Sequence, residues 1–145
     1  MKTILRNIFA VIIGLAVGGA LNMALIIVGP HAIAPPAGVD VTDSHSLSTS
    51  MHLFEPKHFV FPFLAHALGT LAGALLAFLI AASYRSVFAY IIGAFFLAGG
   101  IAACFMIPAP AWFMILDLAA AYIPMAWIGT QLGRRIIGGA GASKS

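Results

Sequence analysis

Charged residues are scarce in this chain. Only 8% of its 145 residues are Asp, Glu, Lys or Arg, whereas 62% are hydrophobic. Soluble domains carry about 25% charged residues, so this chain has too few to cover the surface of a water-soluble fold of its size. A single membrane domain spanning residues 1–145, with the lipid bilayer as its partner, accounts for the composition.

Several chemical motifs are also missing. The single cysteine, Cys104, excludes an intrachain disulfide and Cys-x-x-Cys chemistry. The chain has neither the His-Glu-x-x-His of zinc proteases nor the Gly-x-Ser-x-Gly elbow of serine hydrolases. Its seven Lys and Arg residues form short clusters rather than a basic face with interleaved aromatics. These absences favour a protein that is not an enzyme and that has no nucleic-acid partner.

What is present is a series of long apolar segments, each able to cross a bilayer as a helix of about 20 residues. Pro108-Ala109-Pro110 divides the last apolar region in two, and Gly29-Pro30 is expected to end the first segment. We expect an all-α, antiparallel bundle with transmembrane helices at residues 4–28, 59–83, 87–107 and 111–133. Pro124 predicts a kink in the fourth helix, and residues 134–145 are expected to form a disordered tail.

The first apolar segment precedes Ala32-Ile33-Ala34, a triplet of the kind found at signal-peptide cleavage sites. The segment is longer than the usual apolar core of a signal peptide, which has about 7–15 residues. Pro35 would also follow the cut directly. We therefore expect residues 4–28 to be retained as a spanning helix.

Residues 29–58 form the only sizeable polar stretch. Asp43 is placed to cap a short helix from about Ser44 to Phe54. Leu47, Met51 and Phe54 share one face of that helix, so the helix is expected to lie flat on the membrane surface over the mouth of the bundle.

Basic residues predict the orientation of the bundle. Six of the seven fall on one side of a four-helix arrangement, namely Lys2, Arg6, Arg85, Arg134, Arg135 and Lys144. Only Lys57 falls on the other side, together with three of the four acids. The positive-inside rule then places both termini in the cytoplasm and the 29–58 loop outside.

The chain resembles small four-helix proteins of the bacterial inner membrane, so that is the membrane we expect. It is similar in size and helix number to small multidrug-resistance exporters. Those proteins carry an essential glutamate in the first helix, whereas residues 4–28 contain no acid. Their activity is therefore not transferred to this chain.

Small residues recur every four positions in three of the predicted helices. Gly-x-x-x-Gly spacing lets helices approach closely. The stripes are Ala10, Gly14 and Gly18; Ala65, Gly69, Gly73, Ala77 and Ala81; and Gly129 with Gly133. They predict close helix packing. A compact monomer could use the stripes within its own bundle, but their number favours packing with a second copy of the chain or within a larger membrane complex.

One polar residue stands out in each of three predicted helices: Asn22, His66 and Asp117. At 1.5 Å per residue, all three lie roughly 9–11 Å below the outer surface. Ionisable groups in hydrocarbon are costly and should find partners, so we expect Asp117 to pair with His66, with Asn22 and Thr70 completing the hydrogen bonds. Two interpretations stay open: a proton or ligand site that opens toward the outer side, or a polar clasp that fixes helix register.

The outer loop offers a second set of candidate ligands. His52, Glu55 and His58, with His45, carry imidazole and carboxylate groups suited to zinc or copper. Pro56, however, prevents the three closest residues from lining one helix face.

These features together favour a non-enzymatic binding or accessory protein that assembles with itself or with a larger complex. The alternative is a proton- or cation-linked transporter or channel that uses Asp117 and His66. A third, weaker interpretation is a metal-handling protein that uses the outer histidines.

Overall fold

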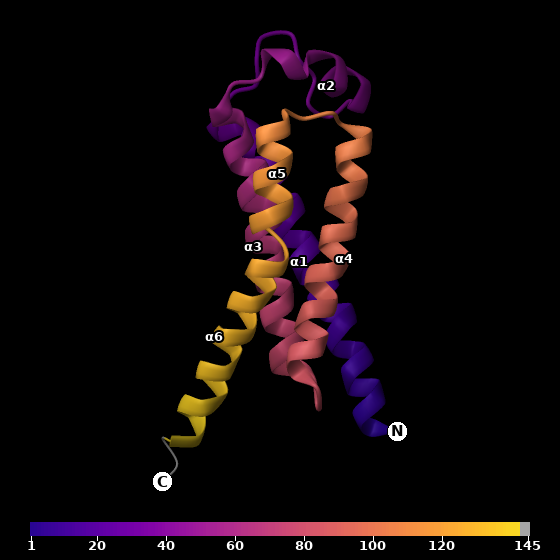
Figure 1. The fold of residues 1–145 in the computed structure, drawn as a ribbon, viewed down its shortest axis with the longest axis vertical. Coiled ribbons are helices and arrows are strands. Elements are labelled where there is room, and N and C mark those ends of the chain that lie inside the picture. The colour runs from indigo at the N-terminus through magenta and orange to yellow at the C-terminus, as the bar shows by residue number, and fades with distance from the viewer. Residues whose placement is uncertain (143–145) are drawn as a thin grey trace.

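The computed structural model describes residues 1–142 as an all-helical bundle (Figure 1). Its helices are α1 (Lys2–Ala32), α2 (Ser44–Ser50), α3 (Val60–Ile80), α4 (Arg85–Met106), α5 (Ala111–Ala120) and α6 (Ile123–Ala142), with 3₁₀ turns η1 (Met51–Leu53) and η2 (Pro56–Phe59). Within this range, four helical segments are long and apolar enough to cross a membrane: Lys2–Ala32, Pro56–Ile80, Arg85–Met106 and Ala111–Gly139. The predicted fold class is confirmed, and these spans imply a surrounding lipid bilayer.

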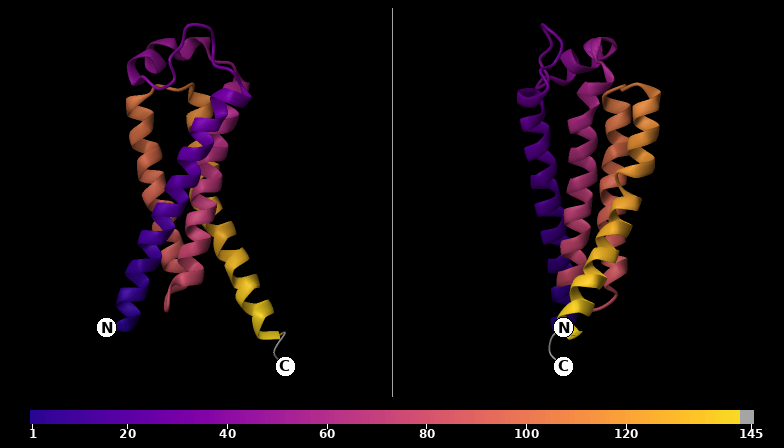
Figure 2. Two further views of the ribbon diagram at one scale, coloured as in Figure 1. Left: turned by 180° about the vertical axis from the view of Figure 1, so that it is seen from behind. Right: turned by 90° about the vertical axis from the view of Figure 1, so that its left-hand side faces the viewer.

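Helix α3 occupies the centre of the bundle. It contacts α1 along much of its length and also packs against α4 and α6. The two views of Figure 2 show α1 beside α3, with the α2 region crossing one end of the bundle and the start of α1 and the end of α6 at the other end. For brevity, the α2 end is called the loop end and the opposite end the terminal end.

The close contact between α1 and α3 depends on their small-residue stripes. A Cβ atom added to Gly14 would lie 2.7 Å from the carbonyl oxygen of Gly73, and one added to Gly18 would lie 2.6 Å from that of Gly69. Both distances are shorter than real Cβ contacts allow. The small-residue stripes of α1 and α3, from which we predicted assembly with a partner, therefore pack against each other within one chain.

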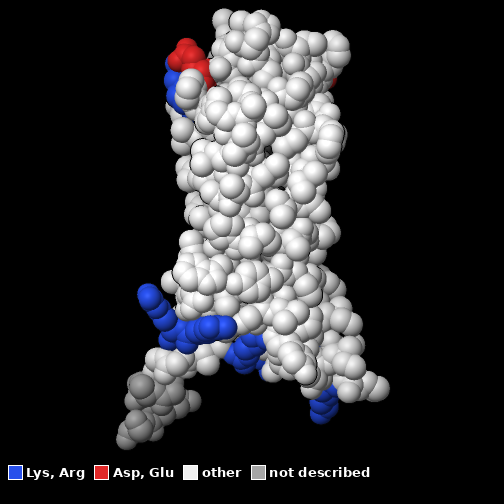
Figure 3. Space-filling model, in the orientation of Figure 1, with Lys and Arg blue, Asp and Glu red and all other residues white. Residues whose placement is uncertain are grey.

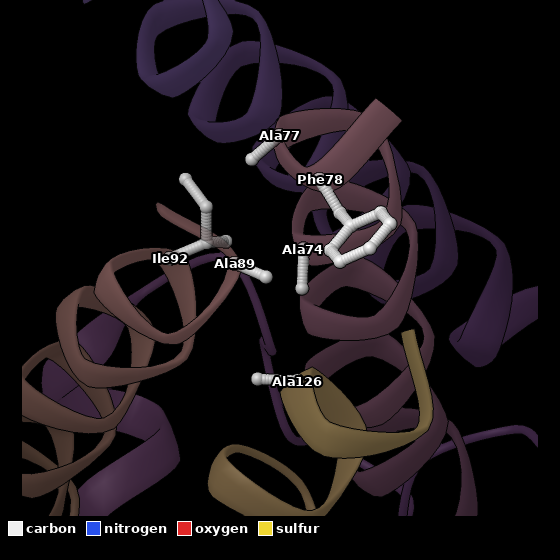
Figure 4. Packing of buried hydrophobic residues seen from close by; sticks show 6 residues of the cluster. All are labelled: Ala74, Ala77, Phe78, Ala89, Ile92 and Ala126. Atoms are coloured by element: carbon white, nitrogen blue, oxygen red, sulfur yellow. The ribbon is translucent and has the colours of Figure 1, made fainter. Parts of the chain in front are cut away.

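The core between α3, α4 and α6 is also built from small side chains. Ala74, Ala77, Ala89 and Ala126 are fully buried, and the fully buried Ile92 belongs to the same cluster (Figure 4). In lipid, helix association relies on such close packing rather than on exclusion of water. Large apolar side chains are instead exposed around the outside of the spans, where they would face the bilayer.

The first span is longer than predicted. Helix α1 runs through Gly29-Pro30 and ends at Ala32, where the Ile33 N–H donates to the Gly29 carbonyl oxygen over 2.8 Å. Proline lacks one N–H, but its fixed φ is compatible with a helix. The expectation that Gly29-Pro30 ends this helix is therefore wrong by about one turn.

The fourth span consists of two helices rather than one kinked helix. Helix α5 ends at Ala120 and α6 begins at Ile123. Pro124 is the second residue of α6, where its missing N–H has no intrahelical partner to lose. Helix α6 then continues to Ala142, so residues 134–142 are helical and the predicted disorder is wrong there; residues 143–145 lie outside the described range.

A short cap covers the loop end of the bundle. The Asp43 carboxylate accepts a hydrogen bond from the Ser46 N–H over 2.8 Å, which confirms the predicted start of α2. Met51 packs with Phe59 and Phe113, and Leu47 and Phe54 join the same cluster. The apolar face of the α2 region thus rests on the ends of α3 and α5.

The two ends of the bundle differ in charge (Figure 3). Figure 3 shows Lys and Arg side chains gathered at the terminal end. Lys2 and Arg6 lie in the first turns of α1, Arg85 begins α4, and Arg134 and Arg135 lie in the second half of α6. Asp40, Asp43 and Glu55 lie in the segment between α1 and α3, where Lys57 pairs with Glu55, and Asp117 is the single acid within the described spans.

Candidate functional site

The most polar cluster inside the bundle joins His66 of α3, Asp117 of α5 and Tyr122 of the α5–α6 break. His66 Nδ1 lies 2.9 Å from both carboxylate oxygens of Asp117. The Tyr122 hydroxyl donates to Asp117 Oδ2, also over 2.9 Å. Asp117 is only 5% exposed and Tyr122 only 2%, so the carboxylate receives two donors in a site that is otherwise apolar.

The break between α5 and α6 shapes this cluster. The Ala121 N–H donates to the main-chain oxygen of Asp117 over 2.9 Å, which closes the last turn of α5. In a continuous helix, Tyr122 would lie about 140° around the axis from Asp117. The break removes this constraint, and the Tyr122 ring packs against Gly100 of α4, where an added Cβ would overlap the phenol.

The contact with Asp117 orients the His66 ring. When the carboxylate is ionised it only accepts hydrogen bonds, and Nδ1 of His66 is then the donor. The His66 side chain keeps 23% of its exposure, whereas the Asp117 side chain keeps 7%. The imidazole, stacked on Tyr122 with ring centroids 5.8 Å apart, is therefore the more accessible member of the pair.

Two of the four predicted site residues stay outside this hydrogen-bonded cluster. The Thr70 hydroxyl donates to the main-chain oxygen of His66 over 2.7 Å, rather than to the carboxylate. Asn22 lies at the α1–α3 contact, where a Cβ on Gly69 would come within 3.0 Å of the Asn22 Cβ. Across residues 1–142, no hydrogen bond joins Asn22 to His66 or Asp117.

Sequence reasoning missed Tyr122. A tyrosine in an apolar span has no motif around it, and helical spacing places it on a different face from Asp117. The available signal was Pro124, because a helix break shortly after a buried acid changes which neighbours that acid can reach.

The outer-loop residues predicted as metal ligands are not brought together. His58 Nδ1 accepts a hydrogen bond from the Glu55 N–H over 2.9 Å, and His52 Nδ1 lies 3.1 Å from the Thr49 carbonyl oxygen. Lys57 pairs with the Glu55 carboxylate over 2.9 Å and lowers its pKa. Local turns thus engage one ring nitrogen each of His52 and His58, and His45 joins neither of them. No group of three or more His, Cys, Asp or Glu side chains able to hold a metal occurs in residues 1–142.

Asp40 also belongs to the local structure of the loop. Its Oδ1 accepts hydrogen bonds from both the hydroxyl and the N–H of Thr42, over 2.6 and 2.8 Å, and these lower the pKa of the carboxyl. The loop end therefore carries ionised carboxylates that are engaged in turns.

A cavity of about 510 Å³, called the outer cavity below, opens between the loop end of α1, the following loop and the start of α3. Apolar side chains make up most of its walls, and its polar members are His31, Thr42 and His58. Neither His66 nor Asp117 lines it. Its apolar lining residues are Met23, Ile26, Ile27, Pro30, Ile33, Pro35, Val41, Leu47, Phe54, Phe61 and Pro62.

No known family model, curated protein or solved structure matches this chain. The function is therefore inferred from geometry alone.

The geometry offers two kinds of chemistry. The His66–Asp117–Tyr122 cluster can hold a proton between an imidazole and a carboxylate inside the bundle. The outer cavity can hold an apolar group and present a few polar atoms to one end of it.

Proposed function

We propose that this protein is a non-enzymatic integral membrane protein that binds an amphiphilic, lipid-like molecule in the outer cavity. The observation that carries the proposal is the cavity itself, which is mostly apolar, large enough for a small ligand and lined by only a few polar side chains. Binding sites for small ligands combine these same properties.

Access to the outer cavity favours a ligand that arrives from the bilayer. Met23 and Ile27 of α1 line the cavity and are exposed on the outside of the bundle, at 58% each. The loop that follows α1 crosses this end of the bundle (Figure 2), and its residues Pro35, Val41 and Thr42 line the cavity. An apolar chain would therefore enter sideways from the hydrocarbon.

Two histidines supply polar atoms for a head group. His58 Nδ1 accepts the Glu55 N–H, so in the neutral ring Nε2 carries the proton and is a donor. His31 Nδ1 faces the Ile27 carbonyl oxygen over 3.0 Å and donates to it, which leaves Nε2 as an acceptor. The pair thus offers one donor and one acceptor, which suits an uncharged polar head such as a hydroxyl or a carbonyl.

We place the protein in the bacterial cytoplasmic membrane, with both termini in the cytoplasm and the loop end outside. The charge difference between the two ends supports this orientation, because basic residues concentrate on the cytoplasmic side of membrane proteins. The outer cavity would then lie in the outer leaflet.

The test compares two tryptophan substitutions on α1. Ile27 lines the outer cavity, whereas Ile12 is similarly exposed, at 56% against 58%, but lies elsewhere on the same helix. Ile27→Trp should fill the cavity and weaken binding of a monoacylglycerol probe about tenfold, and Ile12→Trp should bind like the wild type. Native mass spectrometry of the purified protein titrated with the probe measures this. Equal binding by the two variants, or none by the wild type, would refute the proposal.

A second candidate is a proton- or cation-linked transporter or channel that uses Asp117 and His66. The α5–α6 break beside the cluster favours it, since discontinuous helices are typical of coupling-ion sites in transporters. Asp117→Asn should then abolish proton flux in proteoliposomes that carry a pH-sensitive dye, while Asp40→Asn in the loop should not. Wild-type vesicles that are no more permeable than protein-free ones would exclude this candidate.

A further inference from the structure

A second pocket lies at the terminal end of the bundle, opposite the outer cavity. It has a volume of about 440 Å³ and forms where the segment between α3 and α4 meets α6. This inner pocket is lined by Phe78, Ala82, Ser83, Tyr84, Arg85, Ser86, Val87 and Arg134. It therefore combines two guanidinium groups from different helices with three hydroxyl groups.

One of the two arginines is hydrogen-bonded to the neighbouring helix. Arg134 Nη2 donates to the Ser86 hydroxyl over 3.2 Å, which draws α6 toward the first turn of α4. Arg85 begins α4 and is partly buried. Because Arg85 and Arg134 both line this pocket, their charges act on the same volume.

Among residues 1–142, no Asp or Glu side chain lines this pocket. Three of the four acids of the sequence lie in the loop end, and Asp117 is engaged with His66 and Tyr122. In residues 1–142, neither Arg85 nor Arg134 forms an ion pair. Two arginines that line one pocket without a neighbouring Asp or Glu produce a field that favours an anion.

We propose that the inner pocket binds a phosphate group. Guanidinium groups match the oxygen atoms of phosphate in pairs, and the Ser83, Tyr84 and Ser86 hydroxyls provide further donors. The group belongs either to an anionic phospholipid of the surrounding leaflet or to a soluble phosphate. The pocket lies at the basic end of the spans, where an anionic head group would be found if the bundle is oriented as charge predicts.

Adjacent arginines on α6 provide the matched test. Arg134 lines the inner pocket and Arg135 does not, although both are exposed and carry the same charge. The full chain in detergent is titrated with phosphatidylglycerol and phosphatidylcholine by native mass spectrometry, and with inorganic phosphate by calorimetry. Arg134→Gln and Arg85→Gln should each weaken binding about tenfold, whereas Arg135→Gln should not.

The two arms distinguish the source of the phosphate. Preference for phosphatidylglycerol that depends on Arg134 indicates a lipid head group, and phosphate binding that depends on Arg134 indicates a soluble ligand. Circular dichroism and the variant Arg134→Lys, which keeps the charge, separate lost binding from lost folding. Equal affinities of Arg134→Gln and Arg135→Gln in both arms, or no binding of either probe by the wild type, would overturn the proposal. Because neither arginine lines the outer cavity, this result is independent of the function proposed above.

Discussion

Asp117 is held by two side chains that reach it from different elements. His66 comes from α3, and Tyr122 comes from the break that follows α5. A carboxylate in such a buried place requires donors, because transfer of an unpaired charge out of water is costly. At this position the hydroxyl of Tyr122 is as much a part of the site as the imidazole.

The contribution of that hydroxyl can be measured directly. Tyr122→Phe removes one donor to Asp117 and is expected to lower the free energy of unfolding by about 1–2 kcal/mol. Thermal or denaturant unfolding in detergent measures the loss. Tyr90→Phe, on the exposed face of α4, should have little effect. A Tyr122→Phe protein as stable as the wild type would mean that the hydrogen bond contributes nothing net.

Asn7 is a second buried polar residue that sequence reasoning did not single out. Its Oδ1 accepts the Ala82 N–H over 2.8 Å, and its Nδ2 donates to the Ser83 hydroxyl over 3.0 Å. Arg6 next to it donates to the Ile80 carbonyl oxygen. These two residues of α1 thus bind the polar groups left free where α3 ends.

A comparison of two asparagines on α1 tests this role. Asn7→Ala leaves buried main-chain groups without partners and is expected to cost about 1–3 kcal/mol. Asn22→Ala should cost less, because Asn22 makes no hydrogen bond with the polar cluster. Unfolding of both variants in the same detergent gives the comparison. A larger loss for Asn22→Ala would restore Asn22 to the site predicted from the sequence.

At the scale of helices, spans are predictable and their breaks are less so. Length and hydropathy alone locate the spans, because a bilayer imposes both. Pro124 marks the fourth span as irregular, but whether a proline kinks or breaks a helix depends on its neighbours. In this chain the break is accompanied by packing of the Tyr122 ring against Gly100 of α4. The two residues belong to different elements, so a local sequence pattern does not predict their contact.

The pairing of His66 with Asp117 was predictable from the sequence, whereas the full membership of the site was not. Depth counting brings His66 and Asp117 to one level, and the cost of burying them requires a pairing. Depth counting does not give the rotation of each helix about its own axis. Asn22 shares that depth but lies at the α1–α3 contact, where Gly69 makes room for it.

Glycine positions test the α1–α3 contact. In Gly14→Ala the new methyl group meets the Gly73 carbonyl oxygen at 2.7 Å, so the backbones must separate. Overpacking of this kind costs about 1–3 kcal/mol. Gly19→Ala on the same helix meets nothing within 4 Å, and the higher helix propensity of alanine should leave it neutral or slightly more stable. Unfolding curves of the two variants would contradict this account if they coincide.

For the whole molecule, the two pockets lie at opposite ends and differ in chemistry. The outer cavity is apolar with a few uncharged polar atoms, whereas the inner pocket contains two arginines. The His66–Asp117–Tyr122 cluster lies within the spans and lines neither of them. The two pockets would therefore meet lipids of different leaflets. Which leaflet each pocket meets depends on the orientation of the bundle in the membrane.

Orientation is the remaining prediction, and it follows from charge. Basic side chains resist transfer across the membrane during insertion, so the terminal end should stay in the cytoplasm. In a Cys104→Ala background, Ser46→Cys in α2 should react with a membrane-impermeant maleimide in intact bacterial cells. Gly138→Cys in α6, where an added side chain meets nothing within 4 Å, should react only after the cells are permeabilised. The reverse pattern would place the outer cavity in the cytoplasmic leaflet and the two arginines outside, where the excess of cytoplasmic anionic lipid no longer favours a phosphate ligand.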